Sequence, residues 1–332
     1  MNEIKIGIIG LGHLGKLHLK NLLELDNATC SGIFEIDKEK AKSISEEFKI
    51  KFHNDLETLI ESSDAIIISV PTSFHFEVGK IALEKKRHIF IEKPITVTVD
   101  EANELISIAK ENGCLIQVGH IERFNPALLA LEKYNLEPMF IQSDRLSQFN
   151  PRGTDVAVIL DLMIHDIDII LHLVKSDVEK IDANGVAVVS NSIDIANARI
   201  QFKNGCVANV TASRISQKKM RKMRMFQRDA YIAIDFLQGI SEIYKLVNPD
   251  EEFIGISYGV IGTGEKRRRI IYEQPEIPVV NAMKYEQAMF VKSIKENLPP
   301  IVSGEDGKKA LEVAQYIIDV IEKGKVNKKL TN

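Results

Sequence analysis

The chain contains no tryptophan and only three cysteines among 332 residues, and these shortages exclude several classes of protein. Cys30, Cys114 and Cys206 lie far apart, with neither a zinc-ligand spacing nor the pattern of a disulfide framework. No apolar run approaches the roughly 20 residues that a membrane span needs. Residues 1–5 show no signal-peptide pattern and lead directly into a strand-like segment. We therefore expect a reducing, cytoplasmic protein with no metal site and no membrane partner.

Charge is nearly balanced over the whole chain but is uneven along it. The 43 basic and 47 acidic residues give a net charge of −4, which provides no general attraction to nucleic acid. Residues 212–228 nevertheless contain no acidic side chain. The basic residues of this tract are Arg214, Lys218, Lys219, Arg221, Lys222, Arg224 and Arg228. Two interpretations remain open: a solvated hairpin whose lysines discourage sheet aggregation, or a surface for one anionic partner.

The order of apolar segments predicts an α/β protein with two domains. Over residues 1–121, short apolar runs alternate with helical spacing, which is typical of a parallel, doubly wound sheet. We expect this part to form a Rossmann dinucleotide-binding domain. The expected strands are 4–9, 29–34, 65–70, 88–92 and 115–118, and the expected helices are 14–25, 38–48, 76–86 and 99–111.

Residues 122–332 have a different order of elements. After one helix, successive strands follow without intervening helices, which predicts a largely antiparallel, open sheet in an α+β domain. Two helices end the chain, and the prediction allows them to pack against the Rossmann domain. The expected helices are 156–174, 282–297 and 308–323, and the expected strands lie near 180–190, 193–202, 206–213, 223–236 and 240–247.

Residues 10–15, Gly-Leu-Gly-His-Leu-Gly, match the G-x-G-x-x-G pattern of dinucleotide-binding sites. The pattern follows an expected strand and opens an expected helix, and Glu35 ends the next strand. Glycines let the backbone turn tightly and approach a pyrophosphate, whose charge the N–H groups of the helix N-terminus bind. This context disfavours the alternative, a glycine-rich turn in an unrelated sheet.

Glu35 also indicates which cofactor binds. A carboxylate accepts hydrogen bonds from ribose hydroxyls and repels a 2′-phosphate, for which NADP sites usually supply a nearby cation. Ile36 and Asp37 follow Glu35, and the first basic residue beyond them is Lys38. The sequence therefore favours NAD over NADP.

Two further groups of polar residues lie where chemistry is expected. Lys93 follows an expected strand, at the edge where doubly wound sheets bind ligands; it is either an ordinary surface lysine or a group that polarises a substrate oxygen. Asp161, His165 and Asp168 share one face of an otherwise apolar helix. Because unpaired buried charge is costly, this row indicates either a catalytic site or an internal salt-bridge network.

Five motifs occur in a fixed order along the chain. They are Gly10-x-Gly12-x-x-Gly15, Thr72-Ser73-Phe74-His75, Glu92-Lys93-Pro94, Gly119-His120-Ile121-Glu122-Arg123-Phe124-Asn125-Pro126 and Asp161-x-x-x-His165-x-x-Asp168. Together they resemble the glucose-fructose oxidoreductase / inositol dehydrogenase / MocA family over essentially the whole chain. The resemblance implies oxidation of a sugar or cyclitol hydroxyl by a nicotinamide cofactor. It also implies a substrate-binding second domain whose open sheet joins subunits into a homodimer or homotetramer.

The resemblance implies roles for individual residues as well. His165 would take the hydroxyl proton, Asp161 would support its imidazole, and Lys93 would stabilise the developing alkoxide. The cofactor-binding residues carried over by motif are Gly10, Gly12, His13, Leu14, Gly15, Glu35, Val70, Thr72, His75, Glu92 and Lys93. The candidate substrate-binding residues are His120, Arg123, Asn125, Asp168 and Arg214.

One residue departs from the family pattern. Many relatives have D-x-G-x-H where this chain has Met163 in place of the glycine, so a free hexose is a doubtful substrate. Residues 119–126 and 211–216 resemble the branch that acts on the 3-hydroxyl of UDP-N-acetylglucosamine-type sugars, and the basic tract suits a diphosphate. The alternatives are an inositol or free-sugar dehydrogenase and a non-catalytic NAD-binding regulatory protein. A regulatory protein would be expected to lack Lys93 or His165, and this chain has both.

Overall fold

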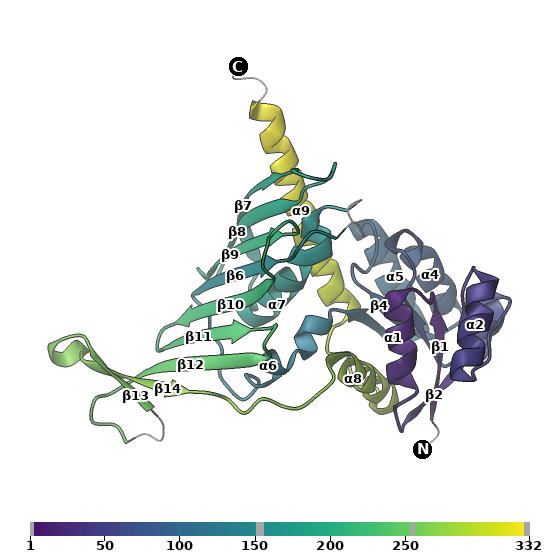
Figure 1. Ribbon diagram of the computed structural model, residues 1–332, viewed down its shortest axis with the longest axis horizontal. Coiled ribbons are helices and arrows are strands. Elements are labelled where there is room, and N and C mark those ends of the chain that lie inside the picture. The colour runs from purple at the N-terminus through teal and green to yellow at the C-terminus, as the bar shows by residue number, and fades with distance from the viewer. Residues whose placement is uncertain (1–2, 151–155, 253–255, 329–332) are drawn as a thin grey trace. The chain divides into compact units, whose positions relative to one another are not determined.

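The computed structural model describes residues 3–150, 156–252 and 256–328, and the chain forms two compact units. The first unit is Met1–Phe124 with Val280–Glu312, and the second is Asn125–Val279 with Val313–Asn332. The first unit therefore combines the N-terminal part of the chain with a helix from much later in the sequence. Each unit is described by itself below (Figure 1).

The first unit is built on a five-stranded parallel sheet in the order β2-β1-β3-β4-β5, which confirms the predicted doubly wound fold. Because β2 and β3 lie on opposite sides of β1, the carboxyl ends of β1 and β3 form the crevice where such sheets bind ligands. Its elements are β1 (Ile4–Ile9), α1 (His13–Leu22), β2 (Ala28–Phe34), α2 (Lys38–Phe48), α3 (Leu56–Glu61), β3 (Ala65–Ile68), α4 (His75–Glu84), β4 (His88–Glu92), α5 (Val99–Asn112), β5 (Ile116–Gly119) and α8 (Ala282–Glu296), with short 3₁₀ turns at Thr72–Phe74 and Ile121–Phe124.

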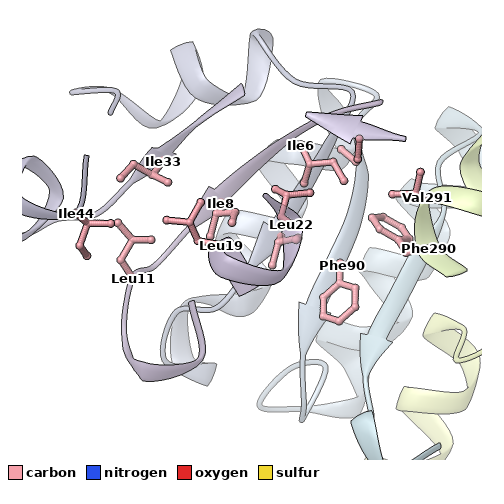
Figure 2. Packing of buried hydrophobic residues seen from close by; sticks show 13 residues of the cluster. Ile6, Ile8, Leu11, Leu19, Leu22, Ile33, Ile44, Phe90, Phe290 and Val291 are labelled. Atoms are coloured by element: carbon pink, nitrogen blue, oxygen red, sulfur yellow. The ribbon is translucent and has the colours of Figure 1, made fainter. Parts of the chain in front are cut away.

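Apolar side chains explain why these segments take these positions. The four residues of β3 are all apolar and all buried, as expected for a strand covered on both faces. Ile6 and Ile8 of β1 pack with one face of α1, and Phe290 and Val291 of α8 belong to the same cluster (Figure 2). Burial of this cluster fixes α1, and with it the glycine loop that precedes α1, against the sheet.

The second unit is built on a nine-stranded sheet in the order β13-β14-β12-β11-β10-β6-β9-β8-β7. The pair β6–β9 is parallel and the other described pairs are antiparallel, which confirms the predicted α+β class. Its elements are α6 (Pro126–Leu129), β6 (Phe140–Leu146), a π-helix (Ile159–Met163), α7 (Ile164–Val174), β7 (Val178–Val186), β8 (Ile195–Phe202), β9 (Val207–Ser213), β10 (Met220–Gln227), β11 (Ala230–Asp235), β12 (Ile240–Val247), β13 (Ile256–Ile261), a 3₁₀ turn (Gly264–Lys266) and β14 (Arg268–Glu273), and the unit shares α9 (Gly304–Lys328) with the first.

Alternation along the strands gives this sheet two different faces. On one face, small residues such as Ala198 of β8, Ala208 of β9 and Ala212 of β9 are buried, and they leave room for α7 to pack closely. On the other face, aromatic and charged side chains predominate. Figure 1 shows α7 against the sheet of this unit.

The second unit adds detail to the sequence predictions in three places. The run 223–236 forms two strands, β10 and β11, with a turn at residues 228–229. The helix expected over 156–174 begins as a π-helix and becomes α-helical only at Ile164. Strand β6 was not expected, because its inward positions include Ser143 and Arg145, whose polarity conceals the period of two.

Candidate active site

The glycine loop between β1 and α1 has the geometry that the pattern predicts. Gly10 has a φ of +86°, and a Cβ there would lie 2.5 Å from the Ser69 carbonyl oxygen. A Cβ at Gly15 would lie 2.0 Å from the Gly10 carbonyl oxygen, so both positions require glycine. A Cβ at Gly12 would meet nothing within 4 Å, which leaves open space directly at the start of α1. The loop thus has room for a pyrophosphate.

The N-terminus of α1 is electrostatically suited to an anion. Gly12 is its N-cap residue and supplies no side-chain cap, and the first turn of this described helix has no acidic residue. The N–H groups of this turn therefore depend on solvent or a ligand for partners, and the helix dipole favours negative charge there. His13 and Leu14 are the first residues of the turn, and both are exposed. The loop and the helix end together fit the diphosphate of a dinucleotide.

Glu35 directly follows β2 and is held beside the glycine loop. One of its carboxylate oxygens, Oε2, accepts the Leu11 N–H at 2.9 Å and the Lys40 ammonium at 3.1 Å. Partial burial alone would raise the pKa of Glu35, but these hydrogen bonds and the Lys40 charge outweigh it, so the pKa is lowered. Glu35 is therefore ionised near neutral pH. Lys40 places a cation beside Glu35, which the sequence analysis, limited to residues 36–38, did not predict.

Glu92 and Lys93 lie at the carboxyl end of β4, and the Lys93–Pro94 peptide bond is cis. Glu92 is hydrogen-bonded to His18 of α1, with 2.7 Å between Glu92 Oε1 and His18 Nε2. Its other oxygen accepts the backbone N–H of Lys93 at 3.3 Å. The neighbouring strand residue is Gly119, where a Cβ would lie 2.9 Å from Glu92 Oε2. The absence of a side chain at Gly119 thus makes space for the carboxylate.

His75 begins α4 and is almost completely buried. Its Nδ1 is 2.9 Å from the Pro94 carbonyl oxygen, and its Nε2 is 3.0 Å from the Val70 carbonyl oxygen. The ring therefore links the segment after β3 to the segment that carries Lys93. Val70 and Thr72 precede His75 and are half-buried. The cofactor contacts assigned to these three residues stay predictions.

In the second unit, Asp161 and His165 lie where the π-helix passes into α7. Both are half-buried, whereas Asp168, one turn further along, is almost completely buried. π-Helical turns occur frequently at functional sites. Met163, the departure from the family pattern, is fully buried within this turn. Its side chain therefore contributes to packing.

The segment after β5 is folded into two short helical turns. His120 and Arg123 are buried in the first unit. Asn125 begins α6 in the second unit, where its side-chain oxygen accepts the Ala127 N–H at 3.1 Å. Its amide nitrogen donates to the Phe236 carbonyl oxygen at 3.1 Å. Asn125 thus has a structural role, and substrate contacts for all three residues stay predictions.

The two units match known proteins over nearly the whole chain. Residues 4–120 match the description "Oxidoreductase family, NAD-binding Rossmann fold", and residues 136–232 match the "GFO/IDH/MocA C-terminal domain". A UDP-N-acetylglucosamine 3-dehydrogenase of Acidithiobacillus ferrooxidans is 32% identical over 323 residues, which cover 97% of this chain and 98% of the relative. The chain belongs to the GFO/IDH/MocA family. This membership confirms the predicted family, sugar-dehydrogenase class and NAD-binding Rossmann fold.

A further relative and two solved structures show the range of similarity. A myo-inositol 2-dehydrogenase of Thermotoga maritima is 26% identical over 328 residues and covers 93% of each chain. The solved structure of the A. ferrooxidans UDP-N-acetylglucosamine 3-dehydrogenase gives a TM-score of 0.86 at 31% identity and covers 97% of this chain and 99% of that one. An apo scyllo-inositol dehydrogenase from Lactobacillus casei has a TM-score of 0.77 at 19% identity, which shows the shared fold.

The basic tract predicted that Arg214 lies on the surface, but the residue is buried, with only 4% of it exposed. Its guanidinium donates to the Val156 carbonyl oxygen at 2.5 Å and lies 3.8 Å from Asp194 Oδ1. Asp194 also accepts backbone N–H groups of residues 188–190 and the Ser190 hydroxyl. Burial alone would raise the pKa of Asp194, but these donors lower it well below its usual range. The Arg214 guanidinium thus has a structural role in this unit.

The rest of the basic tract is divided between the two faces of the sheet. Arg221 of β10 is exposed at the end of its strand, opposite Arg145 of β6, on the face where α7 packs. Lys222 and Arg224 lie on the other, open face, where Lys222 forms an ion pair with Asp235 of β11 at 3.3 Å. The tract is therefore not one continuous surface. Of these three residues, Arg221 alone shares a face with α7.

A buried charge pair joins α7 to the sheet, and its acidic member, Asp166, follows His165 in the sequence. The Asp166 carboxylate accepts Arg145 Nε at 2.5 Å and the Ser143 hydroxyl at 2.8 Å. Arg145 and Asp166 are both at most 2% exposed. The sequence row Asp161–His165–Asp168 did not include Asp166. A buried salt bridge of this helix thus lies on a residue outside the predicted row, and the two interpretations of that row stay predictions.

Two absences are limited to the residues that the structure describes. No helix within residues 3–150, 156–252 and 256–328 is long and apolar enough to cross a membrane. Within those same ranges, no three His, Cys, Asp or Glu side chains are placed to hold a metal ion.

Proposed function

We propose that this GFO/IDH/MocA protein is an NAD-dependent dehydrogenase that oxidises the 3-hydroxyl of a UDP-N-acetylglucosamine-type nucleotide sugar. The observation that carries the proposal is the full-length similarity to the A. ferrooxidans UDP-N-acetylglucosamine 3-dehydrogenase, at 32% identity over 97% of this chain. Lys93 and His165, which the chemistry requires, are both present. Arg221 adds a basic group on the face of the second unit that carries α7.

Each catalytic residue is assigned a role by its motif and its surroundings. His165 accepts the proton of the reacting hydroxyl, because an imidazole titrates near neutrality. Asp161, one turn earlier, orients the imidazole and stabilises its protonated form. Lys93 stabilises the developing alkoxide with its positive charge. Bound NAD supplies the hydride acceptor, and the Gly10–Gly15 loop, the start of α1 and Glu35 would hold it.

A comparison of substrates tests this function. The purified protein is incubated with NAD and, in parallel, with UDP-N-acetylglucosamine, free N-acetylglucosamine, myo-inositol and scyllo-inositol, and NADH formation is followed at 340 nm. Turnover of the UDP-sugar at a kcat/KM at least about tenfold above the others supports the proposal. Preference for an inositol would instead support the alternative, which similarity to the T. maritima myo-inositol 2-dehydrogenase favours.

Arg221 provides a sharper test of diphosphate recognition. We expect Arg221→Ala to raise the KM for the UDP-sugar by about 5- to 30-fold. A hydrogen bond to a charged group is worth about 1.5–3 kcal/mol, and solvent exposure reduces this to about 1–2 kcal/mol. Turnover should fall less, because a contact remote from the hydride acts alike on ground and transition states. Arg224→Ala is the matched control, because Arg224 is an exposed arginine of the same strand on the opposite face. Equal KM values for the two variants would contradict this role of Arg221.

Glu35 and Lys40 predict how cofactor preference can be changed. We expect the protein to bind NADH at least about tenfold more tightly than NADPH, a difference of about 1.4 kcal/mol. Glu35→Ser removes the repelling carboxylate and releases Lys40, now 3.1 Å from Glu35 Oε2, to meet a 2′-phosphate. The preference should then be abolished or reversed, and adding Lys40→Met should remove the gain for NADPH. Fluorescence titration measures each affinity, and equal affinities in the unaltered protein would contradict the prediction.

The open face of the second unit's sheet is proposed as the surface that joins subunits into a homodimer or homotetramer. A row of aromatic rings crosses this face, with neighbouring centroids 4.9–6.0 Å apart. Phe226 is 43% and Tyr258 58% exposed, and exposed apolar rows of this kind are typical of protein interfaces. The members of the row are Phe140, Phe226, Tyr231, Tyr244, Tyr258 and Tyr272. Sedimentation equilibrium of Phe226→Lys against the unaltered protein tests the proposal.

A further inference from the structure

We infer that His18 is a positioning residue of the active site, which acts through Glu92 on Lys93 and is itself oriented by Gln287. The three residues come from distant parts of the sequence and meet inside the first unit: His18 in α1, Glu92 at the end of β4 and Gln287 in α8. The catalytic part of the inference depends on the proposed role of Lys93.

The hydrogen bonds around His18 determine which ring nitrogen carries the proton. The Gln287 amide nitrogen lies 2.8 Å from His18 Nδ1 and 3.1 Å from the His18 backbone carbonyl oxygen. A carbonyl oxygen only accepts hydrogen bonds, so the group that faces it must be the amide NH₂ of Gln287. The same NH₂ therefore donates to His18 Nδ1, which must be the unprotonated nitrogen. The single ring proton is on Nε2.

This tautomer makes His18 a hydrogen-bond donor to Glu92. Nε2 lies 2.7 Å from Glu92 Oε1, a short distance typical of a charge-assisted bond. His18 is completely buried, and its ring packs edge-on against Phe90, with centroids 5.1 Å apart. Solvent therefore does not compete with the bond. Ring orientation and proton position are both fixed by neighbours.

Glu92 is held at both carboxylate oxygens beside Lys93. Oε1 accepts from His18, and Oε2 accepts the backbone N–H of Lys93 at 3.3 Å. Burial alone would raise the pKa of Glu92, but the His18 hydrogen bond and the nearby Lys93 charge help to outweigh it, so the pKa is lowered. Glu92 is thus an anion of fixed orientation that contacts the Lys93 backbone and interacts electrostatically with its ammonium group.

Removal of the His18 donor should loosen this arrangement without removing Lys93. A carboxylate that has lost its buried partner rotates or takes up a proton, and the position and charge environment of Lys93 become less defined. Small misplacements of a catalytic group cost up to about 100-fold in rate. We therefore expect His18→Phe to lower kcat by about 10- to 100-fold and to change KM by less than about threefold. His18→Gln, which keeps a donor, should restore part of the loss.

The tautomer is tested first, without reference to any substrate. Long-range ¹H–¹⁵N spectra of the histidine-labelled protein at pH 7 should contain a neutral Nε2–H imidazole whose signals are missing from His18→Phe. Gln287→Met should keep the Nε2 proton, which Glu92 still accepts, and should shift the Nδ1 resonance, because the donor to Nδ1 is lost. A charged His18, or one protonated on Nδ1 in the unaltered protein, would overturn the inference.

Kinetics then separate positioning from general damage to the core. Phe90→Leu is the matched control, because it removes the ring packed on His18 and leaves the hydrogen bonds: it should lower Tm and keep kcat. The double variant His18→Phe with Glu92→Gln should be no slower than Glu92→Gln alone, since His18 acts through Glu92. The inference would be overturned if the kcat loss of the double variant equalled the product of the two single-variant losses. It would also be overturned if the lower kcat of His18→Phe were explained entirely by a smaller fraction of folded protein. An unaltered protein inactive on UDP-sugars would refute the proposed function instead, and the spectra would still decide the tautomer.

Discussion

His165→Ala is expected to lower turnover of the sugar substrate at least about 100-fold and to leave cofactor affinity nearly unchanged, because general-base catalysis contributes about 10²–10⁴-fold to rate. His165 is half-buried where the π-helix passes into α7, in the second unit, whereas the glycine loop and Glu35 belong to the first. Without an imidazole, water must take the hydroxyl proton. The loss should therefore appear in kcat and kcat/KM alike.

Stopped-flow NADH formation and NADH fluorescence titration measure the two quantities. His172→Ala is the control, because His172 is an exposed histidine near the end of the same helix. Lys93→Ala should show a comparable loss, since one electrostatic stabiliser of an oxyanion is worth about 10²–10³-fold. Normal turnover by His165→Ala on the substrate found in the screen would remove this residue from the mechanism.

The Rossmann unit could be predicted from sequence because its signals are local. The buried strand β3, Ala65–Ile68, is a continuous apolar run. The conformation of the glycine loop can be read from the loop's own sequence, because Gly10 and Gly15 occupy positions where a Cβ does not fit. These signals need no knowledge of distant residues. The predicted strands agree with the observed ones to within a few residues.

The features that were not predicted depend on contacts between distant segments. Gln287 meets His18 only because α8 packs on α1 in the fold. His18 did have a local signal, as a polar residue within the buried face of α1 formed by Leu19 and Leu22. Lys40 reaches Glu35 because the first turn of α2 follows β2 closely. Sequence spacing alone does not reveal such pairs.

The basic tract, residues 214–228, illustrates a second limit of prediction from sequence. Charge pattern treats residues 214–228 as one group, whereas strand alternation puts Arg221 and Arg224 on opposite faces and burial turns Arg214 inward onto Asp194. Predicting this division requires the exact start of β10, which is the least certain property of a strand read from sequence. The structure therefore separates the tract into the buried Arg214, residues on the face with α7 such as Arg221, and residues on the open face such as Arg224.

Asp166→Ala is expected to destabilise the second unit by about 3–5 kcal/mol, because it removes an anionic partner from the buried Arg145 guanidinium. The pair is tightly bonded: Asp166 Oδ2 accepts Arg145 Nε at 2.5 Å, and Asp166 Oδ1 accepts the Ser143 hydroxyl at 2.8 Å. Neither charged side chain is more than 2% exposed, so water cannot replace the lost partner. Urea unfolding at pH 7, followed by circular dichroism, measures the free energy.

Two further variants distinguish loss of charge compensation from loss of packing. Asp182→Ala is the control, because it breaks the Lys180–Asp182 pair, which has a similar 2.8 Å separation but is more than half exposed, and it should cost at most about 1 kcal/mol. Arg145→Met combined with Asp166→Leu removes both charges and should recover most of the stability lost in Asp166→Ala. If Asp166→Ala costs no more than the exposed control, the pair does not stabilise α7 on the sheet. If the double variant is as unstable as the single one, the cost comes from packing and the Ser143 hydrogen bond, and not from the loss of charge compensation at Arg145.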